Sequence, residues 1–543
     1  MNEEPDSKSS TVCDRRTFLE SAATAFWSLG TVAGGATFLE SQACSATAPG
    51  EVSLAELRDG LRSGRFTSRT LVRRFLARIK ELDQPPIALR SVIEFNPDAL
   101  DIAAARDAER REGRPLGPLH GLPILIKDNI DTHDRMTTTA GSLALLGSIP
   151  PRDAFVAQQL RQAGAVLLGK TNLSEWANFR GNRSTSGWSG RGGQTRNPYV
   201  LDRNPSGSSS GSAVAVAASL CAAAVGTETD GSILSPSSYN GIVGLKPTVG
   251  LISRAGIIPI SHTQDTAGPM TRTVRDTAIL LGALAGTDPR DPATAEASTK
   301  RARDYESFLN PDGLRGARLG VARELFGSNA AAQRVTEQAL AVLTARGAVL
   351  VDPVAIPSRN KFGAAEQTVF LYELKVGLNA YLASLGAAAP HKTLADLIEF
   401  NERHRESELP WFGQENFLAA QAKGPLTEPA YLEALATCRK FAREEGIDAV
   451  MNEHRLDALV APTTGPAHVT DHIHGDRGSG SSTSLAAVAR YPSITVPAGF
   501  VSELPVGISF FGRAWSEPVL LKLAYAFEQA TKHRRPPRFL VSI

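Results

Sequence analysis

The stretch of the chain that decides its fold runs from residue 204 to residue 248 and reads NPSGSSSGSAVAVAASLCAAAVGTETDGSILSPSSYNGIVGLKPT. It opens with a loop that is dense in glycine and serine, and the small apolar residues of Ser212–Ala223 then predict a buried helix. Val225–Thr229 is typical of a short strand, and we expect further strands at Gly241–Leu245 and Gly250–Ser253. A flexible linker is a poor interpretation of the loop, because the apolar helix that follows anchors it in a core.

The segments before this stretch alternate between helix and strand. Apolar residues recur at helical spacing over Ser68–Leu82, and Ala99–Arg111 and Asp153–Ala163 also have helical composition. Leu122–Ile126 and Ala165–Leu168 are short apolar runs that predict strands. Such alternation is typical of an α/β fold whose sheet is largely covered by helices.

The second half of the chain contains a more helical and more charged region, residues 287–460. Its clearest predicted helices are Ala331–Ala345 and Tyr431–Met451. After this region the α/β pattern returns, with a strand at Ser493–Val496 and a helix at Glu517–Thr531. We interpret residues 287–460 as a helical subdomain, or cap, that shapes a pocket.

The composition is that of a globular protein, with 42% hydrophobic and 21% charged residues among 543. A net charge of +2 provides no basic surface, so we expect no nucleic-acid partner. Beyond the N-terminal region no stretch is apolar enough to span a bilayer, so we expect no stable membrane insertion of the mature chain. The four cysteines, Cys13, Cys44, Cys221 and Cys438, lack the spacing of a metal site and argue against a disulfide framework.

The first 48 residues have the layout of a twin-arginine export signal. Arg15 and Arg16 form a pair, the stretch Ser21–Leu39 is apolar, and small residues follow at Ala43–Ala48. We therefore expect this segment to direct export to the periplasm or the medium, and residues 49–543 to form the mature domain. The alternative is a tail that contains the arginine pair by chance.

The loop at residues 204–211 admits several functional interpretations. A phosphate-binding loop is disfavoured, because no lysine follows the glycine as in a P-loop and the GxGxxG pattern is absent. The sequence GSSSG also fits the nucleophile elbow GxSxG, with Ser209 as the nucleophile and His468, His472 or His474 as a base. Short matches of this kind arise easily in a serine-rich loop.

A resemblance to a known family explains far more residues. The stretch 204–248 resembles the signature of the amidase signature family, and blocks before and after it match that family in the same order. The blocks are GLPILIKDN (121–129), GKTNLSE (169–175), SGSSSG (206–211), DGSI (230–233), GLKPT (244–248), DTAGPM (265–270) and YPSITVPAG (491–499). Within the family, the forms of the two central blocks are most similar to those of bacterial peptide amidases.

The resemblance implies the family fold, a mixed central β-sheet with α-helices on both faces, and assigns roles to matching residues. Ser232 would be the nucleophile, Ser208 the bridging serine, and Lys127 the base at the end of the proton relay. In the family a non-proline cis peptide precedes the bridging serine, so we expect one between Gly207 and Ser208. The family chemistry needs neither a cofactor nor a metal.

The resemblance also implies an oxyanion hole made by the backbone N–H groups of Thr229, Asp230, Gly231 and Ser232. The sequence departs from the commonest pattern in having Asp230 where glycine is frequent, and in having no arginine after Ile233. Backbone donors tolerate the first change, whereas the second alters the wall of the pocket.

A lysine can act as a base only when it is neutral, so its pKa must fall from about 10.4 toward about 7. Burial supplies such a shift, and Lys127 ends an apolar predicted strand. Lys170 ends the next predicted strand in the same way. The residue pattern makes the two lysines equal candidates, and only the family match selects Lys127.

One further cluster, HVTDHIHGD (468–476), has metal-like spacing, but we interpret it as a polar surface loop. The first functional hypothesis is an exported amidase that hydrolyses a carboxamide, such as the C-terminal amide of peptides. The second is the amide-cleaving subunit of a glutamine-dependent amidotransferase. A non-catalytic binding protein is a third, against which the complete set of Ser232, Ser208 and Lys127 argues.

Overall fold

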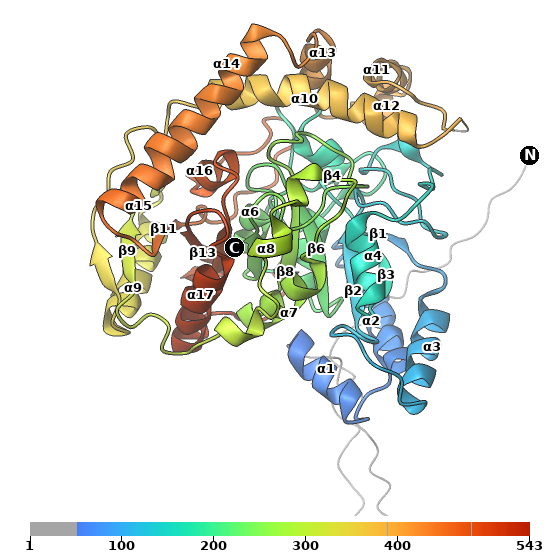
Figure 1. Ribbon diagram of the computed structural model, residues 1–543. Helices are drawn as coiled ribbons and strands as arrows, with labels where there is room; N and C mark the ends of the chain where they lie inside the picture. Colours follow the sequence, from blue (N-terminus) through green and yellow to red (C-terminus); the bar gives the residue numbers. More distant parts are fainter. Residues whose placement is uncertain (1–50, 388, 479) are drawn as a thin grey trace, which may run out of the picture. The chain divides into compact units, whose positions relative to one another are not determined.

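A mixed β-sheet of eleven strands runs through the residues that the computed structural model describes, which are 51–387, 389–478 and 480–543. The strand order is β1-β3-β2-β6-β8-β7-β12-β13-β11-β9-β10 (Figure 1). The predicted export signal, residues 1–48, lies outside the described residues. The strands are β1 (Val92–Phe95), β2 (Pro123–Lys127), β3 (Val166–Thr171), β6 (Ala223–Glu228), β7 (Val243–Lys246), β8 (Thr266–Thr271), β9 (Arg318–Val321), β10 (Val349–Val351), β11 (Ala458–Pro462), β12 (Ser493–Val501) and β13 (Leu504–Phe511).

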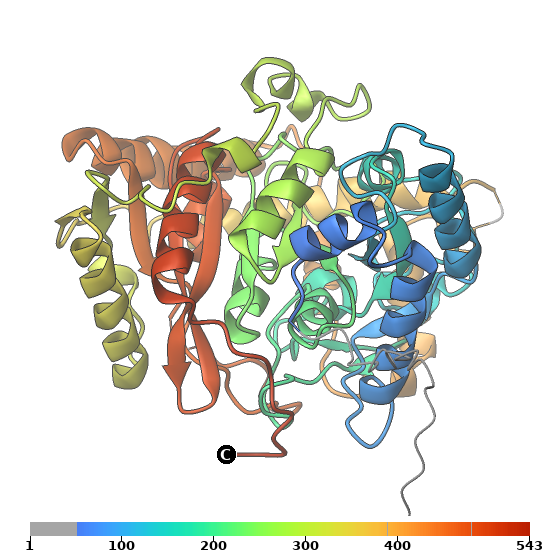
Figure 2. The same ribbon diagram turned by 90° about the horizontal axis from the view of Figure 1, so that it is seen from below.

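The strands that matter most for the site lie together in the first half of the sheet. Strand β2 runs parallel to both of its neighbours, β3 and β6, whereas β8 is antiparallel to β6 and β7. The carboxyl ends of β2, β3 and β6 therefore meet at one edge of the sheet. Figure 2 shows the N-terminal part of the chain at one end of the sheet and β9–β13 toward the other.

Both faces of the sheet are covered. Ile124, Leu125 and Ile126 follow one another in β2 and all have 0% exposure. Neighbouring residues of a strand point to opposite faces, so burial of all three requires helices on both sides. The helices of the first half are α1 (Leu54–Arg62), α2 (Ser68–Leu82), α3 (Ala99–Arg111), α4 (Phe155–Gln162), α5 (Ser210–Ala217), α6 (Leu234–Tyr239), α7 (Val274–Leu284) and α8 (Ala297–Lys300).

Residues 287–460 contain most of the remaining helices and also contribute β9, β10 and part of β11 to the sheet. Helix α10 packs against α13 and α14, and these helices lie along one side of the ribbon in Figure 1. That this region shapes a pocket stays a prediction. Within this region lie α9 (Ala330–Ala345), α10 (Gly363–Ser384), α11 (Leu394–Arg403), α12 (Arg405–Glu408), α13 (Glu415–Gln421), α14 (Pro429–Cys438), the π-helix η6 (Arg439–Asp448) and α15 (Ala449–Glu453). Helices α16 (Thr483–Val488) and α17 (Glu517–Thr531) follow it.

The amphipathic helices have the limits that the sequence predicted. The elements predicted from runs of small residues have different limits in the structure. Helices α2, α3 and α17 have the predicted limits. The helix expected at Ser212–Ala223 instead spans Ser210–Ala217, and Ala223 begins β6. Alanine and valine are apolar in either conformation, so their pattern does not mark where this helix ends. The strand expected at Gly250–Ser253 is wrong, since only an isolated bridge between Val249 and Ile252 forms there.

Among the described residues, none of the helices combines the length and apolar character needed to cross a membrane.

Candidate active site

Lys127 is the last residue of β2 and is completely buried. Its Nζ donates to Ser208 Oγ at 2.7 Å, to Thr227 Oγ1 at 2.8 Å and to the Thr227 carbonyl oxygen at 3.3 Å. Thr227 lies on β6, the parallel neighbour of β2, so the pairing of these strands sets the lysine beside it. The structure therefore brings together the predicted base and the predicted bridging serine.

Burial governs the charge of this lysine. Removal from water lowers the pKa of Lys127 to about 7, against the opposing influence of the carboxyl groups of Asp265 and Glu228. The groups that Lys127 contacts directly, on Ser208 and Thr227, are uncharged. A substantial fraction of Lys127 is therefore neutral near neutral pH and able to accept a proton.

Lys170, the second candidate, occupies a different environment although it is equally buried. Its Nζ donates to the carbonyl oxygen of Ile130 at 2.6 Å and to Thr138 Oγ1 at 2.9 Å. Burial lowers its pKa, and the nearby carboxyl groups of Asp128 and Asp131 oppose that shift. The geometry thus separates two lysines that the sequence pattern could not, because Lys127 contacts a candidate serine and Lys170 holds a loop.

The loop before α5 presents Ser208 to Lys127. The peptide bond between Gly207 and Ser208 is cis, as the resemblance implied. Ser208 is fully buried, and its carbonyl oxygen accepts from the N–H of Ser174 at 3.1 Å, which fixes the loop to the segment after β3.

Ser209, the candidate of the nucleophile-elbow interpretation, has a structural position. Its Oγ donates to the Thr227 carbonyl oxygen at 3.0 Å and accepts from the Thr227 N–H at 3.2 Å. The proposed partner histidines have other contacts: His468 Nδ1 lies 2.9 Å from the carbonyl oxygen of Val469, and His474 Nδ1 lies 2.8 Å from Asp471 Oδ2. His472 stacks on Trp411. This arrangement ties Ser209 to strand β6, and no hydrogen bond among the described residues joins its hydroxyl to a histidine.

The turn between β6 and α6 carries the predicted nucleophile. Ser232 is partly exposed, and its carbonyl oxygen accepts from the N–H of Ser209 at 3.2 Å, so the two serine-bearing segments are joined. Gly231 has a φ of +77°, a conformation that side chains other than glycine rarely adopt. Glycine at this position lets the backbone turn sharply before α6.

The backbone donors of this turn are divided into two groups. Glu228 Oε2 accepts from the N–H groups of Ile233 at 2.7 Å and Leu234 at 3.0 Å. Within the described part of the chain, the four preceding N–H groups have no hydrogen-bond acceptor; they belong to Thr229, Asp230, Gly231 and Ser232. Unpaired amides that share one turn can converge on a negatively charged oxygen.

Several residues that the sequence did not single out support this turn. Thr229 Oγ1 donates to Asp265 Oδ1 at 2.5 Å, and Gln264 Nε2 donates both to the Thr229 carbonyl oxygen at 3.3 Å and to Glu366 Oε1 at 2.9 Å. Burial raises the pKa of Asp265 to about 6. Asp265 belongs to the block DTAGPM (265–270), so the sequence could have indicated its place near the site. Glu366 on α10 lies in no such block, so the sequence could not.

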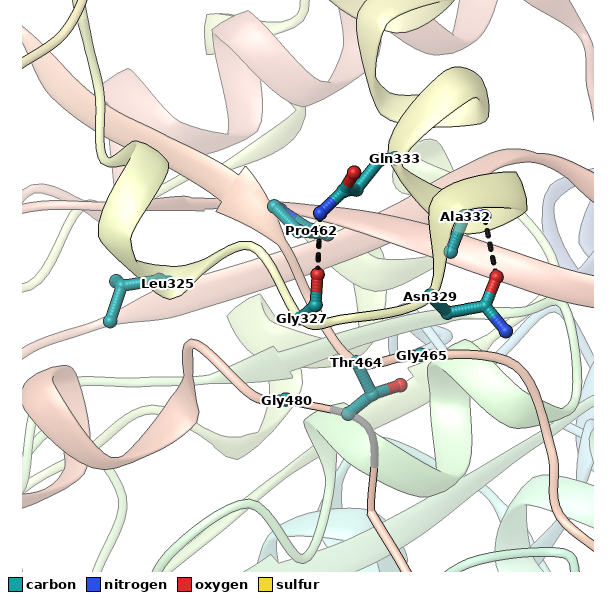
Figure 3. A pocket seen from close by; sticks show the side chains of 9 residues that line it. All are labelled: Leu325, Gly327, Asn329, Ala332, Gln333, Pro462, Thr464, Gly465 and Gly480. Carbon is teal, nitrogen blue, oxygen red and sulfur yellow. Dashed lines mark hydrogen bonds between the residues drawn. The ribbon is translucent and has the colours of Figure 1, made fainter.

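Other features are less suited to chemistry. A hollow of about 10 Å³ lies beside α9 and β11 and is too small for a substrate. Figure 3 shows the side chains that line it. Two hydrogen bonds join residues that line it: Gln333 donates to the carbonyl oxygen of Gly327, and the Ala332 N–H donates to Asn329 Oδ1. In the segment 468–476, Asp476 Oδ1 accepts from the N–H of Ser186 at 3.0 Å. Among the described residues, no group of three histidine, cysteine or acidic side chains is arranged to hold a metal ion.

The chain matches known proteins over most of its length. The family model described as Amidase matches residues 70–521. A probable amidase of Arabidopsis thaliana is 44% identical over 90% of this chain and 92% of its own length. A glutamyl-tRNA(Gln) amidotransferase subunit from Moorella thermoacetica is 36% identical over 82% of this chain and 90% of its own length.

Solved structures extend the similarity to the fold. The native peptide amidase of Stenotrophomonas maltophilia is 54% identical, with a TM-score of 0.85 over 90% of this chain and 99% of its own. A peptide amidase in complex with the competitive inhibitor chymostatin has the same identity and a TM-score of 0.87 over the same shares of the two chains. With its mixed sheet, its helices and a family match over most of its length, this chain belongs to the amidase signature family.

Proposed function

We propose that this amidase hydrolyses the C-terminal carboxamide of peptides to a carboxylate and ammonia. The observation that carries the chemical part of the proposal is the buried Lys127, with a pKa lowered to about 7 and 2.7 Å from Ser208. The similarity to peptide amidases supports the substrate class.

Ser232 acts as the nucleophile in this proposal. Its Oγ attacks the amide carbonyl carbon, its proton passes to Ser208, and Ser208 passes its own proton to neutral Lys127. The carbonyl oxygen gains the negative charge and is stabilised by the unpaired N–H groups of the turn 229–232, each worth about 3 kcal/mol in comparable hydrolases.

The remaining steps reverse the proton flow. Protonated Lys127 returns a proton through Ser208 to the leaving nitrogen, the C–N bond breaks, and ammonia departs from an acyl-enzyme on Ser232. Water then attacks the ester carbonyl while its proton enters the same relay, and the carboxylic acid product leaves with the Ser232 hydroxyl restored.

A second candidate is the amide-cleaving subunit of a glutamine-dependent amidotransferase. The observation in its favour is the 36% identity to the glutamyl-tRNA(Gln) amidotransferase subunit of Moorella thermoacetica. That identity is lower than the identity of about 54% to peptide amidases, so the first proposal is preferred.

The substrate test compares two sources of ammonia with the isolated chain. We expect rapid ammonia release from an N-acetylated peptide amide and little from free glutamine, because the isolated chain has no partner protein to complete a glutamine site. The matched control is the same peptide with a free carboxylate. Release from glutamine at the higher rate would replace the first proposal by the second.

A covalent probe tests the assignment of the nucleophile. A fluorophosphonate is expected to label Ser232, identified by mass spectrometry of the digested protein, and Ser232→Ala should abolish labelling. Ser208→Ala should lower activity strongly and leave slow labelling, because Ser208 only relays the proton. Ser209→Ala should be the mildest of the three changes. Labelling on Ser209, with Ser232→Ala still active, would overturn the mechanism.

The pH dependence tests the base. Lys127 must be neutral to accept a proton, so kcat/KM should rise with pH through an apparent pKa near 7 and then level off. Lys127→Ala should reduce kcat by about 10²- to 10⁴-fold. Lys170→Ala is the matched control: it should cost less activity, and what remains should keep the wild-type pH profile. Equal losses in two variants with native circular dichroism would contradict the choice of Lys127.

We further propose that residues 1–48 direct export through a twin-arginine route, since Arg15 and Arg16 precede an apolar stretch. Replacing both arginines by lysine preserves the charge, yet should leave the protein in the cytoplasm, because the export machinery reads the arginine pair. Cell fractionation followed by immunoblotting measures this. An unchanged distribution between fractions would refute the assignment.

A further inference from the structure

Asp265 lies just before β8 and is buried, yet its carboxyl group accepts three hydrogen bonds. Oδ1 accepts from Thr229 Oγ1 at 2.5 Å, and Oδ2 accepts from the N–H groups of Ile260 and Ser261, both at 2.9 Å. Burial raises the pKa of Asp265 to about 6, and these donors oppose a larger rise. At neutral pH, a negative charge therefore lies beside the first residue of the turn that carries Ser232.

The register of β6 and β8 places this carboxyl group on the face of the sheet that Lys127 uses. Thr227 of β6 is paired with Ala267 of β8, and two further steps along the same register set Thr229 opposite Asp265. Alternate residues of one strand share a face, and so do residues that lie directly opposite each other on two strands. The side chains of Thr227, Thr229 and Asp265 therefore lie on one face.

The two threonines also set the separation of the two charges. Lys127 Nζ donates to Thr227 Oγ1 at 2.8 Å, whereas Asp265 Oδ1 binds the hydroxyl of Thr229. Alternate residues of a strand are about 6.6 Å apart, so the ammonium and carboxyl groups are about one such step from each other. Burial lowers the pKa of Lys127, and of the two carboxyl groups that oppose this effect Asp265 is the stronger.

Glu228, the weaker of the two carboxyl groups, has a different position and a different task. It lies between Thr227 and Thr229 in the sequence, so its side chain points to the opposite face of β6. Its Oε2 accepts from the N–H groups of Ile233 and Leu234, at the far end of the turn. Asp265 is thus the carboxyl group that both binds the start of the turn and shares a face with the Lys127 ammonium group.

The other charged groups around Asp265 have partners of their own. Arg254 favours the ionised form of Asp265, but its guanidinium group donates to Asp291 at 2.8 Å and 2.5 Å. Glu373 on α10 accepts from Ser261 Oγ at 2.5 Å and lies 3.5 Å from His262. Among the described residues, neither Asp265 nor Lys127 has a hydrogen bond to a charged side chain. The charge of Asp265 therefore acts on Lys127 directly. The remaining charged groups on nearby elements are Glu366 on α10 and Arg490 after α16.

We propose that Asp265 is a positioning residue of the amidase reaction: it fixes the start of the turn 229–232 through Thr229, and its negative charge stabilises the protonated Lys127 that forms when Ser232 attacks. The inference rests on the proposed function and adds to it a residue outside the proton relay. Asp265 neither touches the substrate nor exchanges a proton with Ser208 or Lys127, so its effect is electrostatic and conformational.

The experiment follows ammonia release from an N-acetylated peptide amide as a function of pH in the Asp265→Asn variant. Asparagine has the size of aspartate and keeps an oxygen for the N–H groups of Ile260 and Ser261, but it has no charge. Without the negative charge Lys127 loses its proton more easily, so the rise of kcat/KM with pH should move to lower pH by about one unit. The plateau value of kcat should fall about three- to tenfold, because a less basic lysine accepts a proton less readily.

A second variant tests the same link without altering the carboxyl group. Thr229→Val keeps the shape of the side chain but removes one of the three donors to Asp265, so Asp265 takes up a proton at higher pH. The midpoint of the kcat/KM profile should therefore move in the same direction by a smaller amount, and kcat should fall about fivefold because the turn is held less firmly. Asp312→Asn is the matched control: it removes the same charge at an exposed position and should keep the wild-type midpoint and kcat.

The position of the midpoint separates the possible outcomes. An unshifted midpoint in Asp265→Asn with native circular dichroism would overturn the inference, even if kcat falls, because a purely structural role lowers kcat without moving the pH profile. If Asp265→Asn does not fold, an unshifted midpoint in Thr229→Val has the same meaning. In both cases the proposed function stands. A wild-type profile that does not rise through a pKa near 7 would instead contradict the proposed role of Lys127 itself.

Discussion

The burial of the Lys127 ammonium group at the end of β2 is the constraint on which the rest of the site depends. An ammonium group removed from water loses solvation that only charged or well-placed polar partners can replace. Ser208 and Thr227 give Lys127 uncharged partners at 2.7 Å and 2.8 Å, while Asp265 and Glu228 favour the charged form from farther away. The balance lowers the pKa to about 7, where the residue can both take and return a proton.

Strand β6, whose Thr227 binds Lys127, also aligns the two serine-bearing segments. Thr227 binds Lys127 through its side chain and carbonyl oxygen, and binds Ser209 through both of its backbone groups. Ser209 then donates its N–H to the carbonyl oxygen of Ser232. A single residue of β6 therefore fixes the relative positions of the lysine, the loop before α5 and the turn before α6. A small shift of that strand would move all three.

The sequence predicted the features that depend on local pattern. It did not predict those that depend on contacts between residues far apart in the chain. Helix α2 was predictable because its apolar residues repeat at helical spacing. The helix predicted at the position of α5 was too long, because the segment is apolar beyond the end of the helix. Lys127 is the last residue of β2 and Lys170 the last but one of β3, so strand position alone does not distinguish them, whereas the contacts made by their Nζ atoms do. Glu366 left no signal, because its hydrogen-bond partner Gln264 lies far away in the chain.

The carboxyl groups around the turn before α6 raise a question of charge, because negative charge beside an oxyanion would oppose catalysis. Burial raises the pKa of Glu228 and of Asp230, which favours their neutral forms. Lys246, whose own pKa is lowered to about 8, interacts favourably with both when they are ionised. Asp230 Oδ1 is held by Thr483 Oγ1 at 2.9 Å, so this unusual side chain is bound apart from the backbone donors. An acidic residue at position 230 is therefore compatible with the proposed oxyanion hole, because that hole would consist of backbone N–H groups and the Asp230 side chain is bound elsewhere.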